Sequence, residues 1–232
     1  MLLRQLFDKE SSTYTYLLAD PSTREAALID PVVEQIDRDL ELLRELGLTL
    51  RYAIDTHVHA DHVTASGLLR ERTGAQTVAS EKGADCVDVR VRHGDRLPLG
   101  RHVIEVLETP GHTDDSVSYL VDGQVFTGDA LFVRGTGRTD FQNGNPDQLY
   151  DSLTRVLFAL PDDTVVWPGH DYRGHTVSSI GEEKRHNPRI AGRTRAQFVE
   201  IMRTLGLPRP RKIDEAVPAN RECGRIDREV RA

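Results

Sequence analysis

Three histidines and an aspartate lie within six consecutive positions, and this cluster constrains the fold more than any other feature of the chain. The four residues are His57, His59, Asp61 and His62. A strand pattern over residues 51–55 leads into the cluster, and a helical pattern over 63–72 follows it. A strand-to-helix loop brings such side chains close together, as metal binding requires. The sequence therefore predicts a metal site on this loop, with Asp55 available to orient one imidazole.

Further ligand candidates come soon after three later strands. These strands are expected at residues 103–107, 124–127 and 164–167. In each case a glycine directly precedes a side chain that can bind metal, and the three side chains are His112, Asp129 and His170. Glycine allows the backbone to turn sharply at a strand end. Three such ends and the histidine loop together predict one metal constellation.

The order of the predicted elements favours two packed sheets flanked by helices, an α+β architecture. Strands are expected at 13–19, 25–29, 51–55, 76–79, 87–91, 103–107, 116–121, 124–127 and 164–167, and helices at 35–46, 63–72, 146–160, 175–186 and 193–205. Because strands and helices are interspersed without strict alternation, a doubly wound sheet is disfavoured. We expect a single domain over residues 1–232, with 208–232 as a tail packed on it.

Composition narrows the class of protein. With 38% hydrophobic and 29% charged residues the chain has an ordinary globular composition. No stretch has the roughly 18 consecutive apolar residues of a membrane helix. The first residues do not have the apolar stretch and cleavage site of a secretory signal. Two cysteines far apart, Cys86 and Cys223, indicate two ordinary thiols and a reducing compartment. These features predict a cytoplasmic protein without a membrane partner.

The ligand segments resemble, in order, the motifs of the metallo-β-lactamase superfamily. The matching segments are His57-x-His59-x-Asp61-His62, Gly111-His112-Thr113, Thr127-Gly128-Asp129 and Pro168-Gly169-His170. The resemblance implies a four-layer αββα sandwich of two mixed sheets, with the metal at one edge of the sheets.

Finer segments resemble the persulfide dioxygenases within that superfamily. They are 55–67, Gly137-Arg138-Thr139-Asp140-Phe141-Gln142, Pro168-Gly169-His170-Asp171-Tyr172 and Ala216-Val217-Pro218-Ala219-Asn220. The resemblance implies oxidation of glutathione persulfide with O₂ to sulfite and glutathione at one non-haem Fe(II) per chain. It also implies that His57, His112 and Asp129 hold the iron. His59, Asp61, His62 and His170 would then surround this site, or bind a second metal.

Glutathione carries two carboxylates, so its persulfide needs cationic and hydrogen-bonding partners near the metal. Our candidates are Arg138 and Tyr172, which lie in the family-like segments, and Arg189, which lies in the basic C-terminal section. A homodimer is the one oligomer that we consider. The sequence does not set the oligomeric state.

Three other functions remain open at this point. A glyoxalase II-type thioester hydrolase shares the metal motifs, but it has a helical substrate-binding domain for which only 62 residues remain here. A nucleic-acid processing enzyme would suit the 13 basic and 8 acidic side chains after residue 180, but the net charge of −7 argues against it. A metal-stabilised structural module needs only four ligands, fewer than the seven candidates here.

Overall fold

The first half of the chain forms a six-stranded mixed sheet whose strands lie side by side in chain order. In the computed structural model, which describes residues 1–225, the strands β1 to β3 pair antiparallel and β3 to β6 pair parallel. Their bounds are β1 Leu2–Phe7, β2 Tyr14–Ala19, β3 Glu25–Ile29, β4 Thr49–Ile54, β5 Gln76–Ser80 and β6 Val89–Val91. Parallel neighbours need crossover connections, and two helices provide them between β3 and β5.

The second half forms another six-stranded mixed sheet, in the order β12-β11-β10-β9-β8-β7. Only β10 and β11 pair parallel, and the connection between them carries the helical segment that starts at residue 146. The strands are β7 Arg96–Leu99, β8 His102–Glu108, β9 Val117–Val121, β10 Gln124–Phe126, β11 Val165–Trp167 and β12 Ser178–Ser179.

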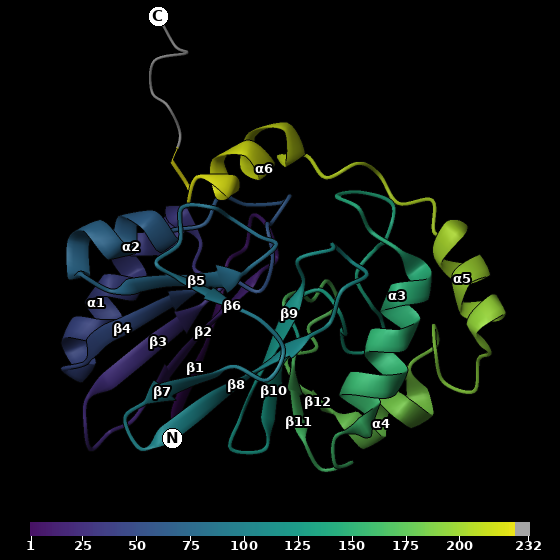
Figure 1. Cartoon of the computed structure of the whole chain (residues 1–232), viewed down its shortest axis with the longest axis horizontal. Helices are drawn as coiled ribbons and strands as arrows, with labels where there is room; N and C mark the ends of the chain where they lie inside the picture. Colours follow the sequence, from purple (N-terminus) through teal and green to yellow (C-terminus); the bar gives the residue numbers. More distant parts are fainter. Residues whose placement is uncertain (226–232) are drawn as a thin grey trace, which may run out of the picture.

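Helices cover the outer face of each sheet. On the first sheet lie α1 (Ile36–Leu46) and α2 (Ser66–Thr73), which share a buried apolar cluster with β2, β3 and β4. On the second lie α3 (Pro146–Asp151) with the π turn 152–156 and 3-10 turn 157–159, α4 (Ile180–His186) and α5 (Arg195–Arg203). Figure 1 shows the resulting order of helices, sheet, sheet and helices. The predicted αββα sandwich is confirmed.

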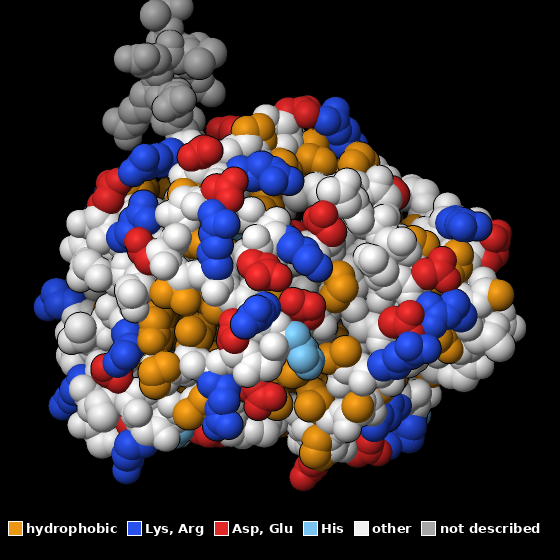
Figure 2. All heavy atoms as spheres, viewed as in Figure 1, with side chains coloured by type: hydrophobic (Ala, Val, Ile, Leu, Met, Phe, Trp, Pro, Cys, Tyr) orange, Lys and Arg blue, Asp and Glu red, His pale blue; other side chains and the backbone are white. Residues whose placement is uncertain are grey.

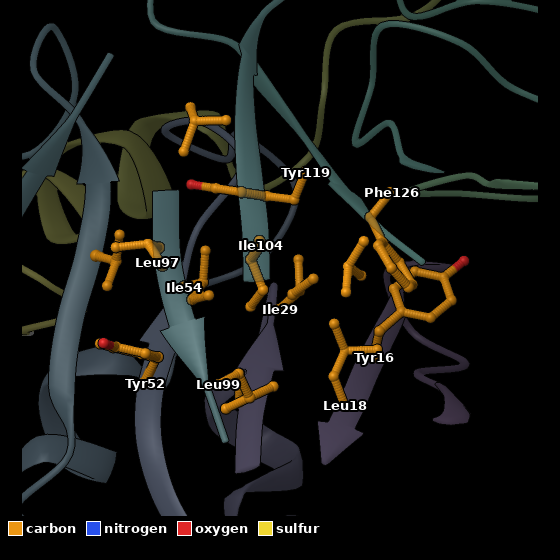
Figure 3. Close-up of a cluster of buried hydrophobic side chains, with 14 of the residues drawn as sticks. Tyr16, Leu18, Ile29, Tyr52, Ile54, Leu97, Leu99, Ile104, Tyr119 and Phe126 are labelled. Atoms are coloured by element: carbon orange, nitrogen blue, oxygen red, sulfur yellow. The ribbon is translucent and has the colours of Figure 1, made fainter. Parts of the chain in front are cut away.

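The two sheets pack face to face through a shared apolar core (Figure 3). Tyr16, Ile29 and Ile54 point inward from the first sheet and meet Ile104 and Phe126 from the second; none is more than 1% exposed. Each such side chain contributes roughly 1.5–3 kcal/mol when fully buried. This core holds the two sheets together, so that the loops after β4, β8, β10 and β11, which carry the ligand candidates, start close to one another.

Local sequence signals explain most of the helix boundaries. Gly47 and Gly74 adopt left-handed conformations, with φ of 61° and 76°, and end α1 and α2. The Asn145 side chain accepts hydrogen bonds from two backbone N–H groups in the first turn of α3. The helix expected from residue 175 begins only at Ile180, because Ser178 and Ser179 pair with β11 as strand β12.

Besides β12 and the 3-10 turn Val33–Gln35, three elements were not predicted. The edge strands β1 and β7 lack a long β-branched run, and their formation depends on neighbours that offer a free sheet edge. The third is α6 (Ile213–Arg221), a helix within the expected tail that contains Pro218. The part of the expected tail over residues 226–232 lies outside the described residues. Among the described helices, none has the length and apolarity needed to cross a membrane.

The interpretation of Cys86 and Cys223 as separate thiols is wrong. Their Cα atoms lie 5.9 Å apart, and the two form a disulfide. The sequence separation of 137 gave no sign of this pairing. It arises because α6 brings Cys223 back onto the loop between β5 and β6, where Cys86 lies. The cysteines therefore give no support to a reducing compartment.

Candidate metal centre

All seven ligand candidates converge where the two sheets end side by side. The loop with His57, His59, Asp61 and His62 follows β4, whereas the other three candidates follow β8, β10 and β11. The fold thus joins one loop of the first sheet to three strand ends of the second. Six of the candidates form two sets that share no residue.

The first set consists of His57, His112 and Asp129, each of which offers one ligand atom within 4.8 Å of the others. The His112 Nε2 atom lies 3.4 Å from an Asp129 oxygen, and the His57 and His112 rings are 4.9 Å apart at their centres. Two imidazoles and one carboxylate that share one face of a metal ion form the facial triad of non-haem Fe(II) oxygenases.

A chain of hydrogen bonds sets the orientation of His57. The Thr56 hydroxyl donates its proton to Asp30 at 2.9 Å, so it accepts from the Nδ1–H of His57 at 3.0 Å. This leaves the Nε2 lone pair of His57 free for a metal. His112 is held similarly, because its Nδ1–H donates to the Arg138 carbonyl at 2.7 Å.

The second set consists of His59, Asp61 and His62, again with ligand atoms within 4.8 Å. Here carboxylates face the imidazoles: His59 Nε2 lies 3.1 Å from Asp30, and His62 Nδ1 lies 3.0 Å from Asp61. His170 connects the two sets. Its Nε2 atom lies 3.5 Å from Asp61 and 3.4 Å from Asp129, while its Nδ1–H donates to the Ser12 carbonyl.

Unpartnered polar atoms in this region fit a bound cation. His59 Nδ1, His62 Nε2 and Asp129 Oδ1 are buried without a hydrogen-bond partner in the described part of the chain. Buried polar atoms are otherwise almost always satisfied. The donor set of imidazole nitrogen and carboxylate oxygen suits iron or zinc. The residues present therefore fit a metal ion.

The electrostatic setting differs between neighbouring histidines. Burial, with His59 and His112 nearby, holds the pKa of His57 well below its usual range, so this imidazole is neutral, as a metal ligand must be. Burial would also lower the pKa of His59, but Asp30, Asp61 and Asp55 outweigh it and raise the pKa to about 10. Burial opposes ionisation of Asp61, yet His62 and His170 keep its pKa well below the usual value.

Two glycines beside the ligands are required by close packing. A Cβ on Gly128, whose φ is 46°, would lie 2.5 Å from the Thr56 hydroxyl that orients His57. A Cβ on Gly169 would lie 2.7 Å from the Asp129 carboxylate. Gly128 therefore serves both the predicted turn and the close packing. Gly169 has no positive φ, so it is needed for space alone.

The sequence did not single out two residues that orient the loop. Asp30, not Asp55, makes the close contact with His59, since Asp55 lies 4.0 Å away and accepts hydrogen bonds from Thr64 and Ser66. The other is Asn220 in α6, whose amide contacts the backbone of the histidine loop. Asp30 follows a strand end as the ligands do, a signal that could have identified it.

The three candidates for substrate binding have different surroundings. Tyr172 is 72% exposed and stacks on His170 at a ring distance of 5.9 Å. The Arg138 guanidinium forms two hydrogen bonds to Asp140 and donates to the carbonyls of Leu207 and Pro208. Arg189 donates to the Thr136 carbonyl and hydroxyl, and burial lowers its pKa. Of the three, only Tyr172 therefore has a polar group, its hydroxyl, that is exposed and not already hydrogen-bonded within the described chain.

The sequence profile of the metallo-beta-lactamase superfamily matches residues 8–85 and 87–170. The chain belongs to this superfamily, as the sandwich and the ligand loops indicate. It is 48% identical over 227 residues to human persulfide dioxygenase ETHE1, mitochondrial, covering 97% of this chain and 89% of the relative. This places it in the persulfide dioxygenase family.

A solved structure agrees with this placement, and a second group of relatives consists of hydrolases. The crystal structure of ETHE1 from Myxococcus xanthus superposes with a TM-score of 0.96 at 68% identity, covering 97% of this chain and all of that one. A hydroxyacylglutathione hydrolase from a Methylobacterium species is 42% identical over 195 residues, 82% of this chain and 74% of its own. The hydrolase is thus a more distant relative, with shorter coverage.

Proposed function

We propose that this protein is a persulfide dioxygenase that converts glutathione persulfide, O₂ and water to glutathione, sulfite and two protons. The observation that carries the proposal is the facial set of His57, His112 and Asp129 in a chain so similar to the ETHE1 proteins. Bound there, Fe(II), one per chain, would supply a centre that changes oxidation state and has open coordination positions.

The protein's own groups would orient and shield this centre. Thr56 and the Arg138 carbonyl hold the imidazoles of His57 and His112 with Nε2 turned toward the site. His59, Asp61, His62 and His170 lie beside it. His59 faces Asp30, whereas Asp61 faces both His62 and His170. We propose that these four act as supporting groups and not as ligands of a second metal.

Binding of the glutathione part would involve the exposed side of the site. Tyr172, stacked on His170, can donate its hydroxyl to a carboxylate of glutathione. Arg138 would act mainly by holding residues 207–208 in place, since Asp140 and two carbonyls occupy its guanidinium. Arg189 is our third candidate, with a positive charge partly shielded from solvent.

A binuclear thioester hydrolase is the second candidate function, and the preformed set of His59, Asp61 and His62 favours it. A nucleic-acid enzyme is disfavoured, because Lys and Arg alternate with Asp and Glu over the face seen in Figure 2 instead of forming a basic stripe. A cytoplasmic location and a homodimer stay predictions.

Metal analysis and O₂ uptake distinguish the two candidate enzymes. We expect about one iron per purified chain, and O₂ consumption that begins when glutathione persulfide is added. Two zinc ions per chain, no O₂ uptake and hydrolysis of a glutathione thioester would refute the dioxygenase. Size-exclusion chromatography with light scattering tests the dimer separately.

A further inference from the structure

The amide of Asn220 is fully occupied by the backbone of the histidine loop. Its Nδ2 group donates to the carbonyls of His59 at 3.0 Å and His62 at 2.8 Å, and its Oδ1 atom accepts from Thr64 N–H at 2.8 Å. The side chain is buried, with 3% exposed. One residue from α6 therefore contacts the histidine loop at three backbone positions, His59, His62 and Thr64.

The chain directly after Asn220 packs on the same loop without spare room. The Cys223 carbonyl accepts from Gly67 N–H at 3.0 Å. A Cβ on Gly224 would lie 2.0 Å from the Thr64 carbonyl oxygen. A shift of this segment would therefore displace Asn220 from its three hydrogen bonds.

Little else in the described chain fastens α6 to the body. Its buried apolar contact consists of Ala216 and Ala219 against Val63, with Val33 beside them. Lys212 forms ion pairs with Glu10 and Glu34. Because these pairs are partly exposed to solvent, they contribute little to the free energy that holds α6 in place. In Figure 1, α6 lies across the ends of the sheets and outside the four layers. The Cys86–Cys223 disulfide is its one covalent cross-link to the loop between β5 and β6.

We propose that Asn220 is a positioning residue of the metal centre and that the Cys86–Cys223 disulfide is a redox-sensitive latch that holds it there. With the disulfide formed, α6 presses the Asn220 amide onto the histidine loop and holds the loop backbone at His59, His62 and Thr64 in place beside the metal ligands. With the disulfide reduced, α6 moves away more often, the loop loses its support, and the metal leaves faster. The inference goes beyond the proposed reaction and rests only on the metal centre.

Opening the latch needs a small thiol as reductant. Its thiolate attacks the sulfur of Cys86, which is partly exposed, whereas Cys223 is 2% exposed. A mixed disulfide forms at Cys86, the Cys86–Cys223 bond breaks, and Cys223 leaves as the thiolate. A second thiol releases Cys86, so two thiols become one small disulfide and the protein gains two thiol groups.

The latch is tested by the rate at which Co(II)-loaded protein transfers its metal to a chelator. Oxidised protein is compared with protein that was reduced by a phosphine and desalted without oxygen, and with Cys86→Ser. We expect the reduced protein and the variant to release metal about tenfold faster than the oxidised protein, a change typical of losing a group that supports a ligand. Reductant should not affect Cys86→Ser. Equal rates for oxidised and reduced protein would refute the latch.

Asn220→Asp tests the positioning role without changing the size of the side chain. The variant keeps the acceptor for Thr64 but loses the donors to His59 and His62. We expect a shifted visible d–d spectrum of bound Co(II) and faster metal release, while Leu43→Ala, a core change in α1, lowers stability and alters neither. An unchanged spectrum and release rate in Asn220→Asp would refute the role. A chain that binds no metal would refute the metal centre and this inference together, whereas metal retention with no redox effect refutes the inference alone.

Discussion

The two sets of ligand candidates differ in what holds their imidazoles. In the first set, His57 and His112 donate to neutral acceptors, the Thr56 hydroxyl and the Arg138 carbonyl. In the second, His59 and His62 face the carboxylates of Asp30 and Asp61. The first set leaves the Nε2 lone pairs of His57 and His112 free to bind a metal, whereas in the second set a carboxylate oxygen lies within 3.1 Å of each imidazole. The hydrogen-bond partners of a histidine therefore decide whether its side chain binds the metal or supports the residues that do.

Removing a ligand of the first set should have the largest effect. We expect His112→Ala to abolish iron retention, because a site with two protein ligands no longer holds the metal through gel filtration. Iron content by mass spectrometry and O₂ uptake measure this loss. His93→Ala removes an exposed histidine and should keep the full iron content. Retention of iron by His112→Ala would mean that the metal lies in the second set.

Removing an outer partner of the first set should have an intermediate effect. Thr56→Val keeps the shape of the side chain but removes the acceptor that orients His57, and we expect iron affinity to fall by about 10–100-fold. Competition with a chelator measures this affinity. The matched control is Thr15→Val, which removes another buried hydroxyl that contacts Asp30. This control should lower the free energy of unfolding by about 1 kcal/mol and leave iron affinity unchanged.

The exposed side of the centre should affect substrate more than metal. Tyr172→Phe removes one hydroxyl that can bind a carboxylate, so KM for glutathione persulfide should rise by up to about tenfold. Iron content and kcat should stay near the values of the unaltered protein. Tyr150→Phe, which removes a hydroxyl that donates to the Arg193 carbonyl, serves as the control. An unchanged KM in Tyr172→Phe would exclude a binding role for this hydroxyl.

Removing a member of the second set should have the smallest effect on the metal. We expect His62→Ala to keep most of its iron, because its partner Asp61 still faces His170. Metal analysis beside His112→Ala makes the comparison direct. Equal loss of metal from both variants would show that the two sets form one binuclear site.

The ligand loops could be predicted because their signals are local. A strand, a glycine and a metal-binding side chain follow one another within a few positions at His112, Asp129 and His170, and the structure brings these ends together. The two-sheet architecture followed from the same strand pattern. Edge strands β1 and β7 were missed because their pairing depends on a neighbour that the local sequence does not reveal.

The outer partners of the site could not be predicted, because their contacts depend on the finished fold. Asn220 reaches residues that are some 160 positions earlier in the sequence, and Cys223 pairs with Cys86 for the same reason. The Arg138 contact to His112 uses a backbone carbonyl, which every residue possesses. Local sequence carries no information on which carbonyl or helix will arrive at a loop.

The position of the ligands on both sheets has a consequence for assembly. His57 belongs to the half of the chain that is made first, whereas His112 and Asp129 follow strands β8 and β10 of the second sheet. A metal ion that joins them must wait until both halves have folded and docked, since long-range contacts form late. Metal loading then favours the docked state by mass action and should raise the melting temperature. The ion thus binds only to a chain whose two halves have both been made and have docked.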